Sequence, residues 1–183
     1  MQAPDQPNNQ SSGGGQRKDP LQDFPAARGH LAEAFRAAVS QQFGPAYFNL
    51  ALCHQYGRSV PASYETAARL YRQSAEQGCV AGKFNLAVCQ FLGQGVAQSI
   101  AGAVKEFRNG AGLGHAESQN NLGYCQYFGK GLKQNYEKAA ECFRMAAAQG
   151  DFMGQYNLSC CFERGLGVAP NEAVALDLRA KAA

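Results

Sequence analysis

The chain repeats itself in a fixed register, and this repetition limits its possible folds more than any other feature. Asn-Leu pairs recur every 36 residues, beginning at Asn49, Asn85, Asn121 and Asn157. Glycines keep the same spacing at Gly57, Gly93, Gly129 and Gly165. Units of this length bury their apolar faces against their neighbours and therefore stack into linear arrays. The sequence thus predicts a tandem-repeat protein.

Each repeat is predicted to contain two helices. Ala46, Leu50 and Cys53 fall on one helical stripe, and Gly57 follows where a helix can end in the left-handed conformation. Residues with good N-cap side chains come next in every unit, at Ser63, Ser99, Asn135 and Asn171. Ala67 and Tyr71 then begin a second stripe. We therefore expect an all-α fold, a superhelix of antiparallel helix pairs.

The register also sets the expected boundaries. Residues 1–23 are rich in Pro, Gly, Gln and Asn and are predicted to be a disordered tail. Residues 24–44 are predicted to form a capping helix, because Phe35 lies one period before Tyr71. Four repeats are expected at 45–80, 81–116, 117–152 and 153–183.

Composition narrows the function classes. The chain has 183 residues, of which 45% are hydrophobic and 17% charged, with a net charge of +3. That charge is too thinly spread to predict a nucleic-acid partner. The sequence contains neither an apolar run long enough to cross a membrane nor the apolar segment of a secretory signal. We expect a cytoplasmic, reducing location and no membrane insertion.

The cysteines follow the repeat register and are predicted to be core residues. They are Cys53, Cys89, Cys125 and Cys161. Helix axes about 8–10 Å apart hold such residues too far from one another for disulfides, and a free cysteine packs well as a small core residue. No metal site is expected. Cys160 lies about 100° around the helix from Cys161 and is predicted to be exposed.

Catalytic motifs are missing from the sequence. It contains no Ser-x-x-Lys, Gly-x-Ser-x-Gly or His-Glu-x-x-His, which would indicate acyl transfer or zinc-dependent hydrolysis. We expect a protein that is not an enzyme and that uses no cofactor.

The recurring pattern resembles the Sel1-like repeat, a relative of the tetratricopeptide repeat. Its parts are Asn-Leu-Gly/Ala, Gly-x-Gly-Val, an N-cap, Ala-x-x-x-aromatic and Gln-Gly, and the match extends from residue 45 to 183. The resemblance implies a right-handed stack and an adaptor or scaffold role. Two alternatives are a fixed subunit of a large assembly and a β-lactamase-like hydrolase, since some Sel1-like proteins carry that label. The missing acyl-transfer motif argues against the hydrolase.

The resemblance places the first helix of each repeat on a concave face. There the asparagines lie about 100° around the helix from the leucines, and an amide both donates to and accepts from a peptide backbone. The predicted groove consists of Asn49, Asn85, Asn121, Asn157, Phe48, Phe84, Tyr156, Leu52, Val88, Tyr124, Tyr56, Leu92 and Phe128. The expected partner is a protein or peptide, bound by a monomer or by one subunit of a hetero-complex. Alternatively, each asparagine ties neighbouring helices together.

Overall fold

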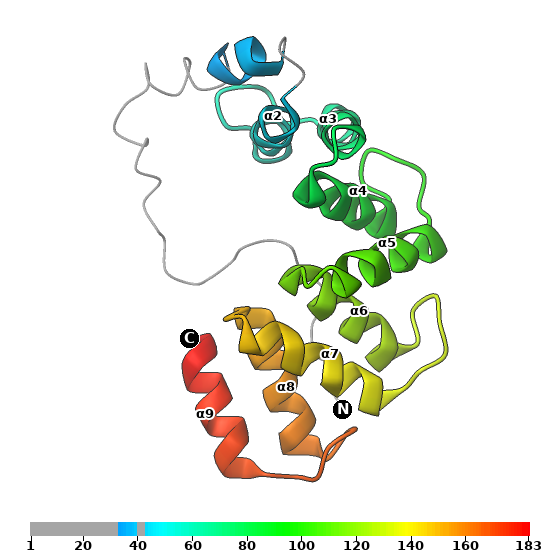
Figure 1. The fold of residues 1–183 in the computed structure, drawn as a ribbon, viewed down its shortest axis with the longest axis vertical. Coiled ribbons are helices and arrows are strands. Elements are labelled where there is room, and N and C mark those ends of the chain that lie inside the picture. The colour runs from blue at the N-terminus through cyan, green and yellow to red at the C-terminus, as the bar shows by residue number, and fades with distance from the viewer. Residues whose placement is uncertain (1–32, 40–42) are drawn as a thin grey trace. The chain divides into compact units, whose positions relative to one another are not determined.

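The computed structural model describes residues 33–39 and 43–183, and within these residues every regular element is a helix. The predicted tail and most of the predicted capping helix lie outside the described residues. After a helical stretch at 33–39, the helices are α2 (Gly44–Tyr56), α3 (Tyr64–Glu76), α4 (Val80–Leu92), α5 (Ile100–Gly112), α6 (Ala116–Phe128), α7 (Tyr136–Ala148), α8 (Phe152–Arg164) and α9 (Glu172–Ala182). The prediction of an all-α fold of packed helix pairs is confirmed (Figure 1).

The described residues fall into two compact units, and the division between them in the sequence falls between Ser99 and Ile100. In the N-terminal unit α3 packs against both α2 and α4, and α2 also contacts α4. The core of this unit includes Leu50, Tyr71 and Cys89, all buried. The helical stretch at 33–39 packs against this core through Phe35 and Val39.

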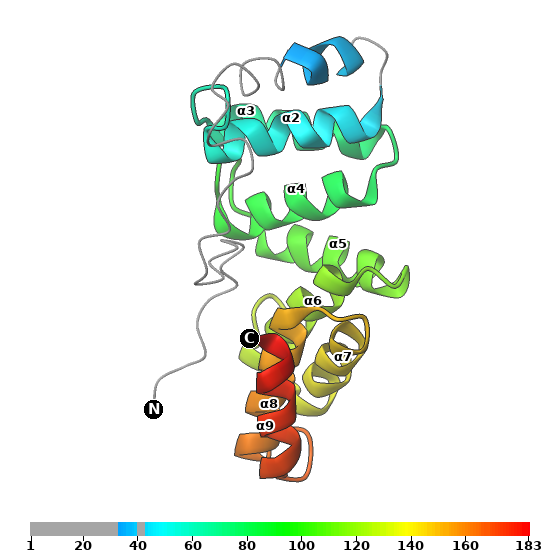
Figure 2. The same cartoon turned by 90° about the vertical axis from the view of Figure 1, so that its left-hand side faces the viewer.

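The C-terminal unit contains five helices, each packed against the next. In addition, α6 contacts α8, so the first helices of two successive repeats touch directly. Helix α9 packs against α8 and lies in front of it in Figure 2. Phe107, Phe143 and the thiols of Cys125 and Cys161 are buried between these helices.

The helix ends use the residue types that the sequence suggested. Gly57, Gly93, Gly129 and Gly165 are C-caps in the left-handed conformation, with φ between 64° and 72°. The side chains of Ser63, Asn135 and Asn171 each accept a hydrogen bond from a backbone N–H three residues later. Asp151 caps α8 in the same way, accepting from the N–H of Gly154 at 2.6 Å. These caps satisfy N–H groups that have no partner inside the helix.

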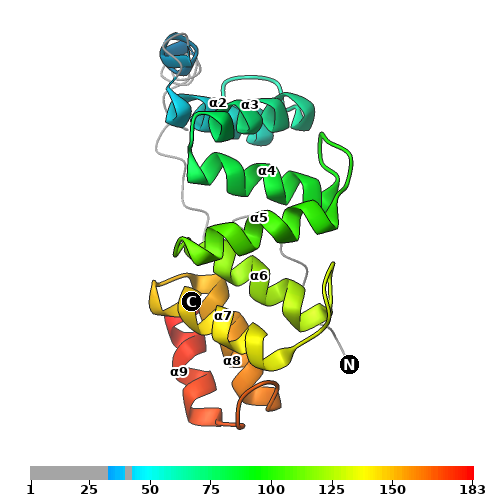
Figure 3. The same ribbon diagram turned by 45° about the vertical axis from the view of Figure 1, so that its right-hand side comes forward.

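The second glycine of each Gly-x-Gly loop packs against the preceding repeat. A Cβ added to Gly95 would lie 2.1 Å from the carbonyl oxygen of Tyr64, where α3 begins. A Cβ on Gly167 would meet the carbonyl oxygen of Tyr136 at the same distance. Figure 3 shows these loops beyond the ends of α4, α6 and α8. The loop glycine is therefore required by the neighbouring helix as well as by its own turn.

The cysteine prediction is right for the repeated positions and wrong for Cys160. Cys53, Cys89, Cys125 and Cys161 are all buried, but Cys160 is also buried, with 3% of its surface exposed. Helix α8 contacts α6, α7 and α9, so its buried arc spans four consecutive residues, 158–161. A face that wide also covers a residue about 100° from the core stripe.

In the part of the chain that the structure describes, no helix is both long and apolar enough to span a membrane.

Candidate functional site

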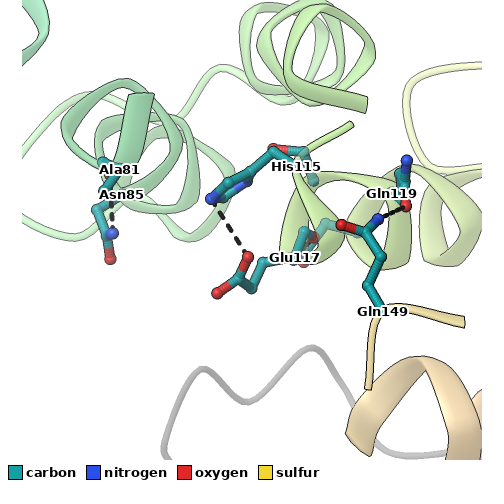
Figure 4. Close-up of polar contacts among 8 residues, drawn as sticks. Ala81, Asn85, His115, Glu117, Gln119 and Gln149 are labelled. Atoms are coloured by element: carbon teal, nitrogen blue, oxygen red, sulfur yellow. Dashed lines mark hydrogen bonds and ion pairs between the residues drawn. The ribbon is translucent and has the colours of Figure 1, made fainter. Parts of the chain in front are cut away.

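The four asparagines of the predicted groove lie at matching positions on α2, α4, α6 and α8, and all are half-buried. The Nδ2 of Asn85 donates to the carbonyl oxygen of Ala81 at 2.9 Å (Figure 4), and that of Asn121 to Glu117 at 2.8 Å. Both acceptors lie one turn back in the same helix. These two amides therefore reinforce their own helices and do not join two helices.

Asn157 makes a different contact. Its Nδ2 donates to the Oδ1 of Asn120 at 2.8 Å, which links α8 to α6. The side chain of Arg164 on α8 also forms a hydrogen bond with Tyr127 on α6. Because the two bonds lie about two turns apart along α8, they hold these first helices together at separate points. Of the hydrogen bonds described for these asparagines, the one between Asn157 and Asn120 joins neighbouring repeats.

The apolar members of the predicted groove differ in exposure. Tyr56 and Tyr156 are exposed, with 43% and 41% of their surfaces accessible. The half-buried members are Phe48, Leu52, Leu92 and Phe128.

Phe84, Val88 and Tyr124 are buried, so little of their side chains is exposed to a ligand. The ring of Tyr124 packs against that of Phe128, with centroids 4.6 Å apart. The two residues lie one turn apart on α6, so this contact is made within a single helix.

Two residues close to the predicted groove positions on α6 and α8 were absent from the predicted groove. Phe152 begins α8 and is 50% exposed, one turn before Tyr156, so the two aromatic rings share a face. Asn120 stands one period after Phe84 and one before Tyr156. The repeat spacing therefore places Asn120 at the same position as these two aromatic residues. It was not predicted with them because its side chain is polar.

Polar contacts gather near the start of α6. His115 lies 3.2 Å from the carboxylate of Glu117, and Gln149 donates to the Oε1 of Gln119 at 2.8 Å (Figure 4). Burial raises the pKa of Asp151 above its usual value, while the N–H of Gly154 lowers it. These groups are accounted for by helix capping and by packing between repeats.

Metal binding and thiol reactivity were considered for the described residues. No three His, Cys, Asp or Glu side chains among them are grouped to hold a metal ion. Burial raises the pKa of both Cys125 and Cys161 to about 12. Such thiols remain protonated near neutral pH and are poor nucleophiles.

The chain belongs to the Sel1 repeat family. The family model for the Sel1 repeat matches residues 44–79, 80–105, 116–151 and 153–183. Proteins built from this repeat generally mediate protein–protein interactions and are typically non-catalytic scaffolds. No match was found among curated proteins.

Solved structures support the same fold. A Sel1 repeat protein from Oxalobacter formigenes is 24% identical with a TM-score of 0.76, and the match covers 82% of this chain and 60% of that one. A protective antigen of uropathogenic Escherichia coli with an SLR fold is 26% identical with a TM-score of 0.71, covering 82% and 32%. A putative Sel1 repeat protein from Klebsiella pneumoniae is 23% identical with a TM-score of 0.56, covering 80% and 74%. The chain thus spans 60% and about a third of the lengths of the first two.

Proposed function

We propose that this chain is a non-enzymatic protein-binding module, and that the α6–α8 surface is its main contact with a partner. This surface consists of Asn121, Phe152, Tyr156 and Asn157. The exposed aromatic pair on α8 is the observation that carries the proposal. Phe152 and Tyr156 keep 50% and 41% of their surfaces accessible although they belong to a well-packed helix. Large exposed aromatic side chains that lie together are common anchors in protein interfaces.

The polar groups beside this pair suit a peptide or helix as ligand. The Nδ2 of the half-buried Asn157 already donates to the Oδ1 of the buried Asn120 at 2.8 Å, which leaves the Asn157 amide with further hydrogen-bonding capacity. Their mutual bond also fixes the two side chains before a ligand arrives. Such preorganisation lowers the entropic cost of binding. The α2–α4 face of the N-terminal unit, with Asn49, Asn85 and the exposed Tyr56, is proposed as a separate binding surface.

A pull-down from extract of the source cells tests the proposal. We expect the wild-type protein to retain a small set of proteins, and the double variant Phe152→Ala/Tyr156→Ala to lose them. Leu176→Ala is the matched control, because Leu176 is 58% exposed but lies on the second helix α9. Equal retention by all three proteins would contradict the proposed surface. One stable stoichiometric partner would favour the fixed-subunit role over a transient adaptor.

A further inference from the structure

A basic surface pocket in the C-terminal unit is not explained by repeat packing. It has a volume of about 300 Å³ and lies where α5, the end of α6 and the start of α7 meet. Its lining consists of Arg108, Gln126, Leu132, Lys133, Gln134, Asn135 and Lys138. Three of these seven residues are cationic and none is acidic.

The three cations have no ion-pair partners among the residues that the structure describes. Arg108, Lys133 and Lys138 come from α5, from the loop before α7 and from the first turn of α7. All three are exposed. The N-terminal end of α7 adds a partial positive charge at the same place. The pocket is therefore matched in charge to an anionic group.

The two lysines are particular to this repeat. Lys133 stands where the other repeats have Pro61, Ala97 and Ala169, and Lys138 stands where they have Thr66, Gly102 and Val174. An arginine equivalent to Arg108 recurs in neighbouring units as Arg72 and Arg144. The fold thus needs neither lysine, since the same loop and helix form without them.

The loop that carries Lys133 is held firmly in place. The N–H of Asn135 donates to the carbonyl oxygen of Gln126 at 2.8 Å, and the Nε2 of Gln134 donates to that of Tyr127 at 2.8 Å. Gly131 packs so closely on α5 that an added Cβ would lie 2.8 Å from a methyl carbon of Ile100. The backbone at the base of the pocket is therefore positioned before any ligand binds.

One lining group favours a peptide over a simple anion. Gln134 is exposed and uses its Nε2 for the bonds to Tyr127 and Tyr136, so its Oε1 is available as an acceptor. A peptide carries N–H groups close to its side-chain carboxylates, whereas sulfate or chloride carries none.

We propose that this pocket binds a side-chain carboxylate, from an Asp or Glu, of a protein partner. The inference rests on the proposed protein-binding function but concerns a different surface, with different residues. The partner must then carry an acidic residue that reaches the loop between α6 and α7.

An NMR titration of ¹⁵N-labelled protein with the blocked peptide acetyl-Glu-Glu-Glu-amide tests the proposal. We expect saturable amide shifts at Gln126 and at residues 132–138. The isosteric peptide acetyl-Gln-Gln-Gln-amide should produce none. Shifts that are equal for both peptides, or absent for both, would overturn the proposal. So would shifts at the same amides with inorganic phosphate alone and none with the glutamate peptide.

Variants distinguish binding in the pocket from a general effect of the protein's net charge. Lys133→Gln/Lys138→Gln should weaken binding of the glutamate peptide at least tenfold. The control Lys83→Gln/Lys105→Gln removes the same net charge from exposed positions outside the pocket and should bind like the wild type. Equal losses in the two pairs would reject a defined site. Phe152→Ala/Tyr156→Ala should bind the glutamate peptide normally, so failure of the α6–α8 surface and failure of the pocket are distinguishable.

Discussion

Gly110 and Ser118 pack so closely that a Cβ on Gly110 would lie 2.3 Å from the Oγ of Ser118. The contact joins a second helix to the first helix of the next repeat. One period earlier the residue types are exchanged, because a Cβ on Gly82 would lie 2.4 Å from the Oγ of Ser74. A glycine on either side thus leaves room for a hydroxyl on the other.

This exchange predicts a compensating pair of substitutions. Gly110→Ser should lower the free energy of unfolding by about 1–3 kcal/mol, because it overfills a closed contact. Adding Ser118→Gly should recover most of that loss, as measured by urea denaturation. Gly112→Ala is the control on the same helix, since a Cβ there meets nothing within 4 Å. A double variant no more stable than Gly110→Ser would refute the pairing.

Ser59 occupies the place of the second loop glycine in the first repeat. Its φ is 66°, a left-handed conformation that is costly for any residue with a side chain. Its Oγ is also buried with no hydrogen-bond partner in the described part of the chain. Ser59→Gly should therefore raise the free energy of unfolding by about 1 kcal/mol, after the greater flexibility of glycine in the unfolded chain is allowed for.

The reciprocal substitution provides the control for Ser59. Gly167→Ser should be destabilising, because its Cβ would lie 2.1 Å from the carbonyl oxygen of Tyr136. Chemical denaturation of both variants under the same conditions gives the comparison. A loss of stability in Ser59→Gly would show that the serine makes a contribution that the loop geometry does not reveal.

The buried thiols predict how stability depends on pH. Burial raises the pKa of Cys125 and Cys161 from 9.0 to about 12. The unfolded chain therefore loses these protons first as the pH rises. Their effect on the free energy of unfolding is small below about pH 9. Above it the free energy should fall by about 1.4 kcal/mol per thiol for each pH unit.

Urea denaturation at pH 7, 9 and 10.5 measures this dependence. The variant Cys125→Ala/Cys161→Ala should show a shallower fall above pH 9, whatever its stability at pH 7. Comparing slopes removes the cost of the cavities that the substitutions create. Identical slopes in the two proteins would mean that these thiols ionise as readily in the folded state as in the unfolded chain.

The asparagines predict unequal effects on stability. Asn157→Ala should lower the free energy of unfolding by about 1 kcal/mol, because it removes the bond between α8 and Asn120 of α6. Asn121→Ala should cost less, since its Nδ2 bonds only to a carbonyl of its own helix. Thermal unfolding of the two variants tests this order. Equal losses would indicate that Asn121 also has a structural role between helices.

Much of the fold was predictable from the sequence, because the features that determine it are local. Gly57 ends a helix and Ser63 starts the next for reasons contained within a few residues. The same register placed Cys125 and Cys161 in the core, since every copy repeats the same environment.

The surface was less predictable because exposure depends on how many neighbours a helix has. Helical geometry placed Cys160 about 100° from Cys161, but α8 is covered by α6, α7 and α9. Tyr124 is also buried, and its ring packs against that of Phe128 one turn later on α6. Lys133 and Lys138 interrupt the repeat pattern, and only the folded loop brings them together with Arg108.

The loop glycines affect where this chain can be divided into transplantable modules. Gly95 packs on the start of α3, and Gly167 packs on the start of α7. A segment cut at the sequence repeat would therefore separate each glycine from the carbonyl that requires it. The self-contained building block instead begins with a second helix and ends after the Gly-x-Gly loop of the following repeat. Chimeras joined at those points should preserve the contact, whereas chimeras joined between repeats would depend on a compatible neighbour.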